Sequence, residues 1–452
     1  MKELLELKEF ETIIGNPDYK DQYKCMGKDS FAELIEFIHA FDSNNTESDV
    51  LDFIKIGYKR NLGETVTFKN YVGLIQIKND CQIQILPKIE FANGEKDETK
   101  RVFMKMLRSM KDFPSKAFTN ANLKTDRMNL YEVFINMYLQ EVRALVKRGI
   151  KSSYVRQEDN LTVYKGKLIV NEHIKANLVH KERFFVGYDE YQVNRAENRL
   201  IKSTLLKLQS ISSSVENGKE IRRLLTSFEL VEPSKNYDKD FSKVVIDRNT
   251  KNYELLMKWA KVFLTDKSFT TFSGMDNARA LLFPMEKVFE SYVACNMKKV
   301  FNKDNWKVSV QDKEHYLFNM LNGEKHRKFA LRPDLVVTRE DGSLIILDTK
   351  WKSLINDKSK NYGISQADMY QMYAYSKKYN TSEIWLLYPA NAAMKDSERI
   401  TFDSGDGATV SLFFVDVANI ENSMGNLLDI LSHHRAEKTI MNGNVGGTNA
   451  IE

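Results

Sequence analysis

The sequence predicts a protein of mixed α/β (α+β) class, in which an N-terminal region of strands and helices precedes a mixed sheet flanked by helices. Apolar and polar residues alternate between Tyr71 and Ile89, which is typical of a strand hairpin. Apolar residues recur at helical spacing in several segments between residues 102 and 264. Beyond residue 329, two apolar strands precede a helix and further strands, which indicates a sheet with helices packed on it.

Length and composition limit the class of protein. The chain has 452 residues, 42% hydrophobic and 29% charged, which is enough for two or three globular domains at roughly 100–200 residues each. No apolar run reaches the ~18 residues of a membrane helix, and the opening MKELLELKEF is too charged for a signal peptide. We therefore expect a cytoplasmic protein without a membrane partner. The positions of Cys25, Cys81 and Cys295 exclude a disulfide framework and a structural zinc site.

The elements of the N-terminal region follow from local patterns. The hairpin between Tyr71 and Ile89 is interrupted at Asn79 and Asp80, and a helix begins near Val102. Helical spacing predicts three more helices, at Leu130–Arg148, Ala196–Leu208 and Asn249–Leu264. Gly149 is a plausible stop for the first of these three.

The division between the two regions is placed at a polar segment. Residues Thr265 to Asp276 are polar and include Gly274, which favours a break. From Ile440 the chain is rich in Gly and Asn, which is typical of a disordered tail. We therefore expect domains at residues 1–275 and 276–439, followed by a tail at residues 440–452.

Positive charge is concentrated in one part of the N-terminal region. Between Glu141 and Lys202, 13 basic residues stand against 8 acidic ones, and this segment accounts for the whole net charge of +5. Five aromatic residues are interleaved with these charges, namely Tyr154, Tyr164, Phe184, Phe185 and Tyr188. The segment is either a phosphate-binding face with stacking groups or a solvated surface with ordinary core aromatics.

The second region carries the chemistry. A strand from Phe329 to Val337, a turn at residues 340–343 and a buried strand from Leu344 onward predict a hairpin. Because side chains alternate along a strand, Asp348 and Lys350 share a face and Thr349 points away, and Asp334 lies late on the neighbouring strand. Phosphodiester hydrolysis needs a hard cation on oxygen ligands and positive charge near the phosphate. Asp334, Asp348 and Lys350 together can supply both.

Spacing alone does not identify this site. The chain contains other triplets of an acidic residue, any residue and a lysine, at residues 6–8 and 98–100. Asp348 and Lys350 differ from these because they end an apolar strand, with Pro333 and Asp334 ahead on its partner. A nuclease site is one interpretation of this context, and a buried structural ion pair is the other.

Helices on both sides of the strands add candidate residues. Pro284 begins a helix in which Glu286 and Glu290 are four apart on one face, so one of them could reach the metal. A helix at residues 364–379 places Gln371 and Tyr375 four apart, where both could face the site or DNA, or Tyr375 could simply pack in the core. Further strands are expected at residues 306–310, 383–389 and 409–417.

The second region resembles the PD-(D/E)xK nuclease superfamily. The strings RPDLVV and LIILDTKWK are similar to the McrC family, the nuclease subunit of the McrBC 5-methylcytosine restriction systems. Upstream, VGLIQIKND, IQILPKI, GIKSSYVRQEDNLTVYKGKL and YDEYQVNRAENRLIKSTL are similar to the same family's N-terminal part, so the resemblance covers most of Val72 to Pro389. It implies a restriction-endonuclease-like core behind a partner-binding region.

The resemblance also implies roles for single residues. In the family the aspartate of the Pro-Asp pair and the Asp-x-Lys pair are catalytic, and these correspond to Asp334, Asp348 and Lys350. The superfamily's helix glutamate falls on Glu290, which we prefer, or Glu286. Gln371 and Tyr375 are similar to the Gln-x-x-x-Tyr element of RecB-like members. The implied cofactor is Mg²⁺ or Mn²⁺, bound by Asp334, Asp348 and Glu290.

Finally, the resemblance implies partners. McrC-like subunits dock through their N-terminal part onto a ring of McrB, an AAA+ GTPase that recognises methylated double-stranded DNA, and stimulate its hydrolysis. The chain has no GxxxxGK[ST] loop, so we expect GTP to be bound by the partner and no nucleotide by this chain. Two alternatives stay open. The protein could be chiefly an assembly and GTPase-activating subunit, or a nuclease of a related restriction or repair system with a different target.

Overall fold

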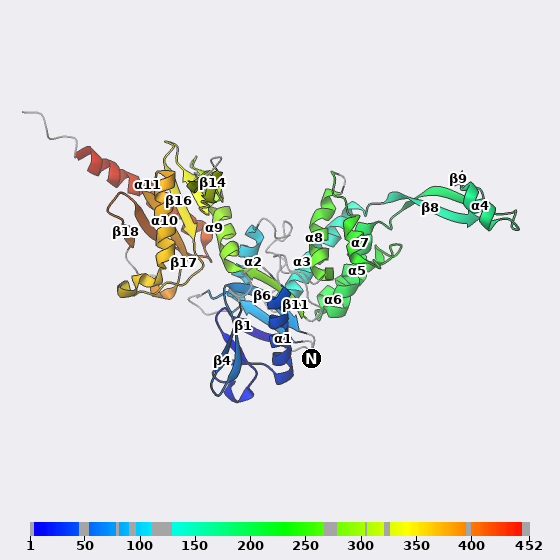
Figure 1. Cartoon of the computed structure of the whole chain (residues 1–452), viewed down its shortest axis with the longest axis horizontal. Coiled ribbons are helices and arrows are strands. Elements are labelled where there is room, and N and C mark those ends of the chain that lie inside the picture. Colours follow the sequence, from blue (N-terminus) through cyan, green and yellow to red (C-terminus); the bar gives the residue numbers. More distant parts are fainter. Residues whose placement is uncertain are drawn as a thin grey trace, which may run out of the picture. The chain divides into compact units, whose positions relative to one another are not determined.

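The computed structural model describes residues 4–44, 54–77, 81–89, 96–110, 129–248, 250–265, 278–302, 305–320, 326–394 and 399–444. These form two compact units (Figure 1). The first unit combines residues 1–73, 79–113 and 282–452, and the second contains residues 74–78 and 114–281. This division differs from the expected one at residues 275 and 276, because the N-terminal residues pack with the C-terminal region. Residues 266–276 of the expected break lie outside the described residues.

The N-terminal strands belong to two small sheets. The strands of one, in spatial order, are β3 (Lys24–Cys25), β2 (Thr12–Ile14), β5 (Gly63–Phe68) and β4 (Ile54–Lys59), with α1 (Lys28–Asn44) following β3 along the chain. The strands of the other are β1 (Leu4–Lys8), β7 (Gln82–Leu86), β6 (Tyr71–Ile77) and β11 (Ala278–Pro284). β6 and β7 confirm the expected hairpin, and the expected interruption at Asn79 and Asp80 lies outside the described residues.

The C-terminal part is built on a six-stranded mixed sheet. Its strands, in spatial order, are β12 (Lys307–Val310), β15 (Leu335–Thr338), β16 (Leu344–Thr349), β17 (Glu383–Pro389), β19 (Thr409–Val415) and β18 (Thr401–Asp403). Antiparallel pairing joins β12, β15 and β16, and parallel pairing joins β16, β17 and β19. The predicted mixed sheet and its strand hairpin are therefore confirmed.

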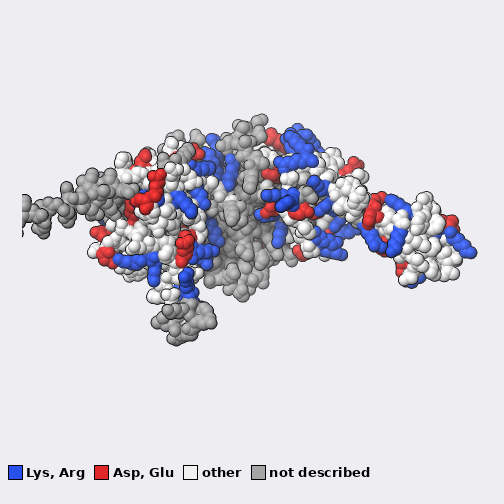
Figure 2. Space-filling view, turned by 90° about the horizontal axis from the view of Figure 1, so that it is seen from above, with Lys and Arg blue, Asp and Glu red and all other residues white. Residues whose placement is uncertain are grey.

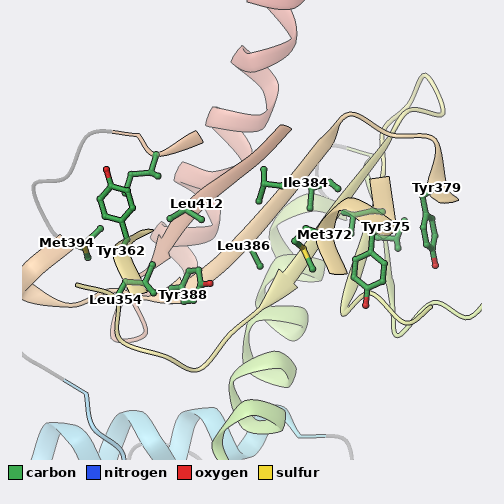
Figure 3. Close-up of a cluster of buried hydrophobic side chains, with 14 residues drawn as sticks. Leu354, Tyr362, Met372, Tyr375, Tyr379, Ile384, Leu386, Tyr388, Met394 and Leu412 are labelled. Carbon is green, nitrogen blue, oxygen red and sulfur yellow. The ribbon is translucent and has the colours of Figure 1, made fainter. Parts of the chain in front are cut away.

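Helices cover this sheet. Residues of α10 (Gln366–Tyr379), including Met372, Tyr375 and Tyr379, form a buried cluster with Ile384 and Leu412 of the sheet (Figure 3). The helices α9 (Met285–Phe301) and α11 (Ile420–Asn444) pack on each other and on the sheet as well. Pro284 caps α9 as predicted, because its fixed φ is compatible with a helix start. α11 extends beyond residue 440, where the tail was expected to begin.

One predicted strand is wrong. Residues 329–337 do not form a continuous strand, because β14 (His326–Ala330) pairs with β13 (Tyr316–Met320) in a separate hairpin and β15 begins only at Leu335. Phe329 has a φ of 58°, which breaks an extended backbone, and Pro333 has no N–H to donate to a ladder. Asp334 therefore lies just before β15, rather than late in a strand.

The second unit is a group of helices from which a strand arm extends. The helices are α3 (Leu130–Arg148), α5 (Ala196–Ile211), α6 (Val215–Thr226), α7 (Tyr237–Ser242) and α8 (Glu254–Thr265). The arm, residues 153–192, consists of β8 (Ser153–Leu161), β9 (Lys167–Leu168), α4 (Val170–Ala176) and β10 (Phe184–Gln192), with β8 and β10 antiparallel (Figure 1). α3 confirms the predicted helix and its stop at Gly149. Within the described ranges, no helix is both long and apolar enough to cross a membrane.

Candidate active site

Two carboxylates meet where β15 and β16 lie side by side. Leu335 is paired with Leu347, so Asp334 and Asp348 are the next residues along the antiparallel ladder. Asp334 is held by Thr349, whose backbone N–H and hydroxyl donate to the same carboxylate oxygen at 2.8 and 2.7 Å. The expectation that Thr349 points away from the cluster is therefore wrong, since its hydroxyl orients Asp334.

Lys350 lies beside Asp348, as the alternation of the strand predicted. Its Nζ is 2.8 Å from Asp348 Oδ2 and 3.7 Å from Asp368 Oδ1. Asp348 is buried, with only 2% of its surface exposed, whereas Lys350 keeps part of its surface in contact with solvent. The backbone N–H of Lys350 donates to Leu387 O of β17, which anchors the lysine to the centre of the sheet.

The two candidate glutamates of α9 have different surroundings. Glu290 accepts a hydrogen bond from Gln311 Nε2 at 2.7 Å, and the same nitrogen is 3.3 Å from Asp334 Oδ1. Glu286 instead accepts from Asn70 Nδ2 at 3.5 Å. The structure therefore brings Glu290 to the carboxylate cluster and places Glu286 one helical turn away from it.

Gln371 and Tyr375 continue the cluster from α10. Lys350 Nζ donates to Gln371 Oε1 at 3.2 Å, and Gln371 Nε2 donates to Tyr375 Oη at 2.8 Å. The Tyr375 ring is buried in the hydrophobic cluster below the sheet (Figure 3). Tyr375 is thus a core residue whose hydroxyl fixes Gln371, and Gln371 in turn fixes Lys350.

Burial dominates the electrostatics of the cluster. Burial raises the pKa of Asp348 to about 7, and the neighbouring charge of Asp334 adds to this effect while Lys350 opposes it. Burial likewise raises the pKa of Glu290 to about 7, together with the charge of Asp334. The pKa of Asp334 is also raised by burial, against the hydrogen bonds from Thr349. Burial lowers the pKa of Lys350, but the nearby carboxylates of Asp348 and Asp368 outweigh this effect, so the pKa is raised.

The donor set suits a hard divalent cation. Asp334, Asp348 and Glu290 offer carboxylate oxygens, which are the ligands that Mg²⁺ and Mn²⁺ prefer. The pKa values of all three carboxyl groups are raised, mainly by burial, and a bound cation would favour their ionised forms. Among the described residues, no group of three Asp, Glu, His or Cys side chains lies close enough together to hold a metal ion. Asp334 and Asp348 could hold such a cation, while the Glu290 carboxylate accepts a hydrogen bond from Gln311.

Three residues of the cluster were not expected from the sequence. Gln311 follows the predicted strand at residues 306–310, and Asp368 lies three positions before Gln371 on a predicted helix, so their locations carried a weak signal. Thr349 was expected to point away from the cluster, yet it donates to Asp334. Neither an amide nor a hydroxyl is distinctive enough to stand out in a sequence without such a structural frame.

The expected phosphate-binding segment has a different character in the structure. Several of its basic residues pair with carboxylates, namely Arg143, Arg156, Lys165, Lys175, Arg195 and Arg199. Large apolar side chains are exposed on the arm, including Leu178 at 73% and Val179 at 84%. Uncharged atoms predominate at the end of the arm, between scattered charges (Figure 2). Such a surface suits a protein partner better than a phosphate backbone.

The sequence and the fold are each similar to those of known proteins. The family model described as McrBC 5-methylcytosine restriction system component matches residues 66–389. The fold is similar to a chain of the refined half-complex of Thermococcus gammatolerans McrB AAA+ hexamers with bound McrC. That match has a TM-score of 0.68 and 17% identity, and it covers 95% of this chain and 100% of that one. A chain of the cryo-EM structure of the Thermococcus gammatolerans McrBC complex matches with a TM-score of 0.47 and 20% identity, covering 66% of this chain and 88% of that one. No curated protein matches the chain.

Proposed function

Because this chain belongs to the family of McrBC 5-methylcytosine restriction system components, we propose that it is the DNA-cleaving subunit of such a system. The observation that supports this most is the grouping of Asp334, Asp348 and Lys350 at adjacent positions of β15 and β16, with Glu290 joined through Gln311. A purely structural ion pair needs no second buried carboxylate beside it, and a second one adds to the free-energy cost of desolvation. The reaction is hydrolysis of a phosphodiester bond.

Each residue has a distinct task in the proposed reaction. Asp334, Asp348 and Glu290 would hold Mg²⁺ or Mn²⁺ through their carboxylate oxygens. When bound, the metal would supply Lewis acidity toward the phosphodiester and toward a water molecule. Lys350 stabilises the negative charge that develops on the phosphate, since its ammonium is on the face of Asp348. Gln371 and Tyr375 keep Lys350 in that position.

The partner in this proposal is a McrB-like AAA+ ring that binds and hydrolyses GTP. We expect the second unit to dock on it and raise its rate of hydrolysis, because the arm exposes apolar side chains that are otherwise unfavourable in water. A relative of similar fold was determined with McrB hexamers, which supports the same assignment. Recognition of methylated double-stranded DNA then belongs to the partner, and cleavage to this chain.

The alternative of an assembly and GTPase-activating subunit is tested by the same reconstitution. The chain is combined with its McrB-like partner, GTP and Mg²⁺, on methylated and unmethylated DNA. We expect cutting of methylated DNA by the wild type and none by Lys350→Ala, with stimulation of GTP hydrolysis retained by both. A wild type that stimulates hydrolysis without cutting DNA would support the alternative.

Lys100→Ala is the matched control for Lys350→Ala. Lys100 belongs to one of the other acidic-x-Lys triplets, and its Nζ pairs with Glu6 at 3.1 Å, far along the chain from the carboxylate cluster. We expect this variant to cut like the wild type. Equal losses from the two variants would show that lysine removal perturbs the fold rather than the reaction.

A further inference from the structure

A buried carboxylate outside the proposed catalytic group links the N-terminal sheet to the active-site strand. Glu9, which follows β1, is 1% exposed and accepts from Trp351 Nε1, at 3.1 Å to Oε2 and 3.3 Å to Oε1. It also accepts from the backbone N–H of Lys88 at 3.0 Å. Trp351 is the residue directly after Lys350, and it is itself buried against Phe289 of α9.

Two exposed side chains beside this linkage line the same cavity as Lys350. Phe10 is the residue after Glu9 in the chain, and Lys88 is the residue whose backbone N–H donates to Glu9. Both line a cavity of about 480 Å³ that Lys350, Ser353 and other residues of the catalytic region complete. The cavity is of the size that holds small ligands, so it can take a short stretch of one strand rather than a duplex.

Phe10 is held in an unusual conformation at this position. Its φ is 68°, in the left-handed region that bulky residues rarely adopt, and its N–H donates to Phe68 O at 2.8 Å. Nearly half of its surface is exposed, at 49%. A strained backbone that holds an aromatic ring in water at the rim of a cavity indicates a binding contact.

We propose that Phe10 and Lys88 form one wall of the DNA groove, in which Lys88 contacts a backbone phosphate beside the scissile one and Phe10 stacks on a nucleotide of the same strand. This inference rests on the proposed function, since it needs DNA to occupy the site at Lys350. An exposed lysine and an exposed aromatic ring on one rim are the two groups that non-specific strand binding uses. Lys352 lines the same cavity but donates to Gly363 O, so it is already engaged.

The test measures binding of a short fluorescein-labelled single-stranded DNA to the full chain by anisotropy, with Ca²⁺ in place of Mg²⁺ to prevent cutting. We expect Lys88→Ala to weaken binding at least about threefold and to reduce the slope of log affinity against log salt by about 0.7, because one phosphate contact is lost. Lys88→Arg should restore both. Phe10→Ala should weaken binding at least about fivefold and leave the slope unchanged, because stacking releases no counterion.

Two residues of β4 serve as controls, since they are exposed in the same N-terminal part but do not line the cavity. Lys55→Ala and Tyr58→Ala should bind like the wild type. The groove is refuted if Lys88→Ala and Phe10→Ala keep wild-type affinity and slope, or if the controls lose as much. If the wild type still cuts DNA in that case, the proposed function stands; if it neither binds nor cuts, both proposals are wrong.

Discussion

Replacement of Asp348 by Asn separates the catalytic role of this side chain from its effect on stability. The substitution keeps the size of the side chain and removes the negative charge that would hold a metal. We expect Asp348→Asn to abolish DNA cleavage and, at the same time, to make the protein more stable than the wild type at alkaline pH. A residue retained for structure would show the opposite change in stability.

The magnitude follows from the buried environment of Asp348, whose pKa is raised from 3.8 to about 7 mainly by burial. Because the folded state binds this proton more tightly than the unfolded state, wild-type stability falls as the pH rises from about 4 to about 7. One pKa unit is about 1.4 kcal/mol, so the ionised side chain costs at most about 4 kcal/mol above pH 7. The buried amide and the loss of Lys350's partner reduce the gain, and we expect about 1 kcal/mol at pH 5 and about 2–3 kcal/mol at pH 8.

Urea unfolding in EDTA, followed by tryptophan fluorescence, measures this difference. Of the four tryptophans, Trp306, Trp351 and Trp385 lie in the unit that carries the site, so the signal reports on that unit. Mg²⁺ at about 100 times its dissociation constant should then stabilise the wild type by about 2.7 kcal/mol and leave Asp348→Asn unchanged. If Asp348→Asn gains no stability, or gains the same amount at pH 5 and pH 8, the reasoning is refuted. The Asp348 carboxylate would then not be a buried charge that destabilises the fold.

Three further predictions concern the cofactor, the partner and the fold. Mg²⁺ and Mn²⁺ should support cleavage, whereas Ca²⁺ should bind without turnover, and cutting that persists in excess EDTA would contradict an oxygen-ligated metal. On the arm, Val179→Asp should lower the stimulation of the partner's GTP hydrolysis at least tenfold; Val245→Asp, at another exposed position of the second unit, should leave it unchanged. Glu383→Gln should reduce the free energy of unfolding by about 3 kcal/mol, since Arg339 is buried and its guanidinium would lose the carboxylate that lies 2.6 Å away. Chemical denaturation of the two proteins measures this loss, and an unchanged midpoint would contradict it.

Much of the sheet could be predicted because its strands are apolar and bounded by turn residues. β17 coincides with the predicted strand at residues 383–389, and the pairing of β15 with β16 follows from the turn at residues 340–343. The common side of Asp348 and Lys350 also followed from strand alternation alone. Local patterns were sufficient wherever the interacting groups are close in sequence.

The parts that could not be predicted depend on contacts between distant residues. Nothing near Glu9 indicates that it accepts a hydrogen bond from Trp351, and the parallel pairing of β1 with β7 leaves no turn signal. The error at residues 329–337 has a different cause. FALRPDLVV has the composition of a strand. The expected strand is interrupted because Phe329 belongs to the separate hairpin of β13 and β14. Tertiary context overrode local propensity there.

The contact of Glu9 with Trp351 can form only late in the synthesis of the chain. The two residues are 342 positions apart, and ribosomes add about 5–20 residues per second, so roughly 20–70 s separate their emergence. The second unit, residues 74–78 and 114–281, is made entirely within that interval and contains the arm. If the chain has the proposed function, it completes the unit that docks on the partner before it completes the site that cuts DNA, so the host genome is not exposed to a premature nuclease.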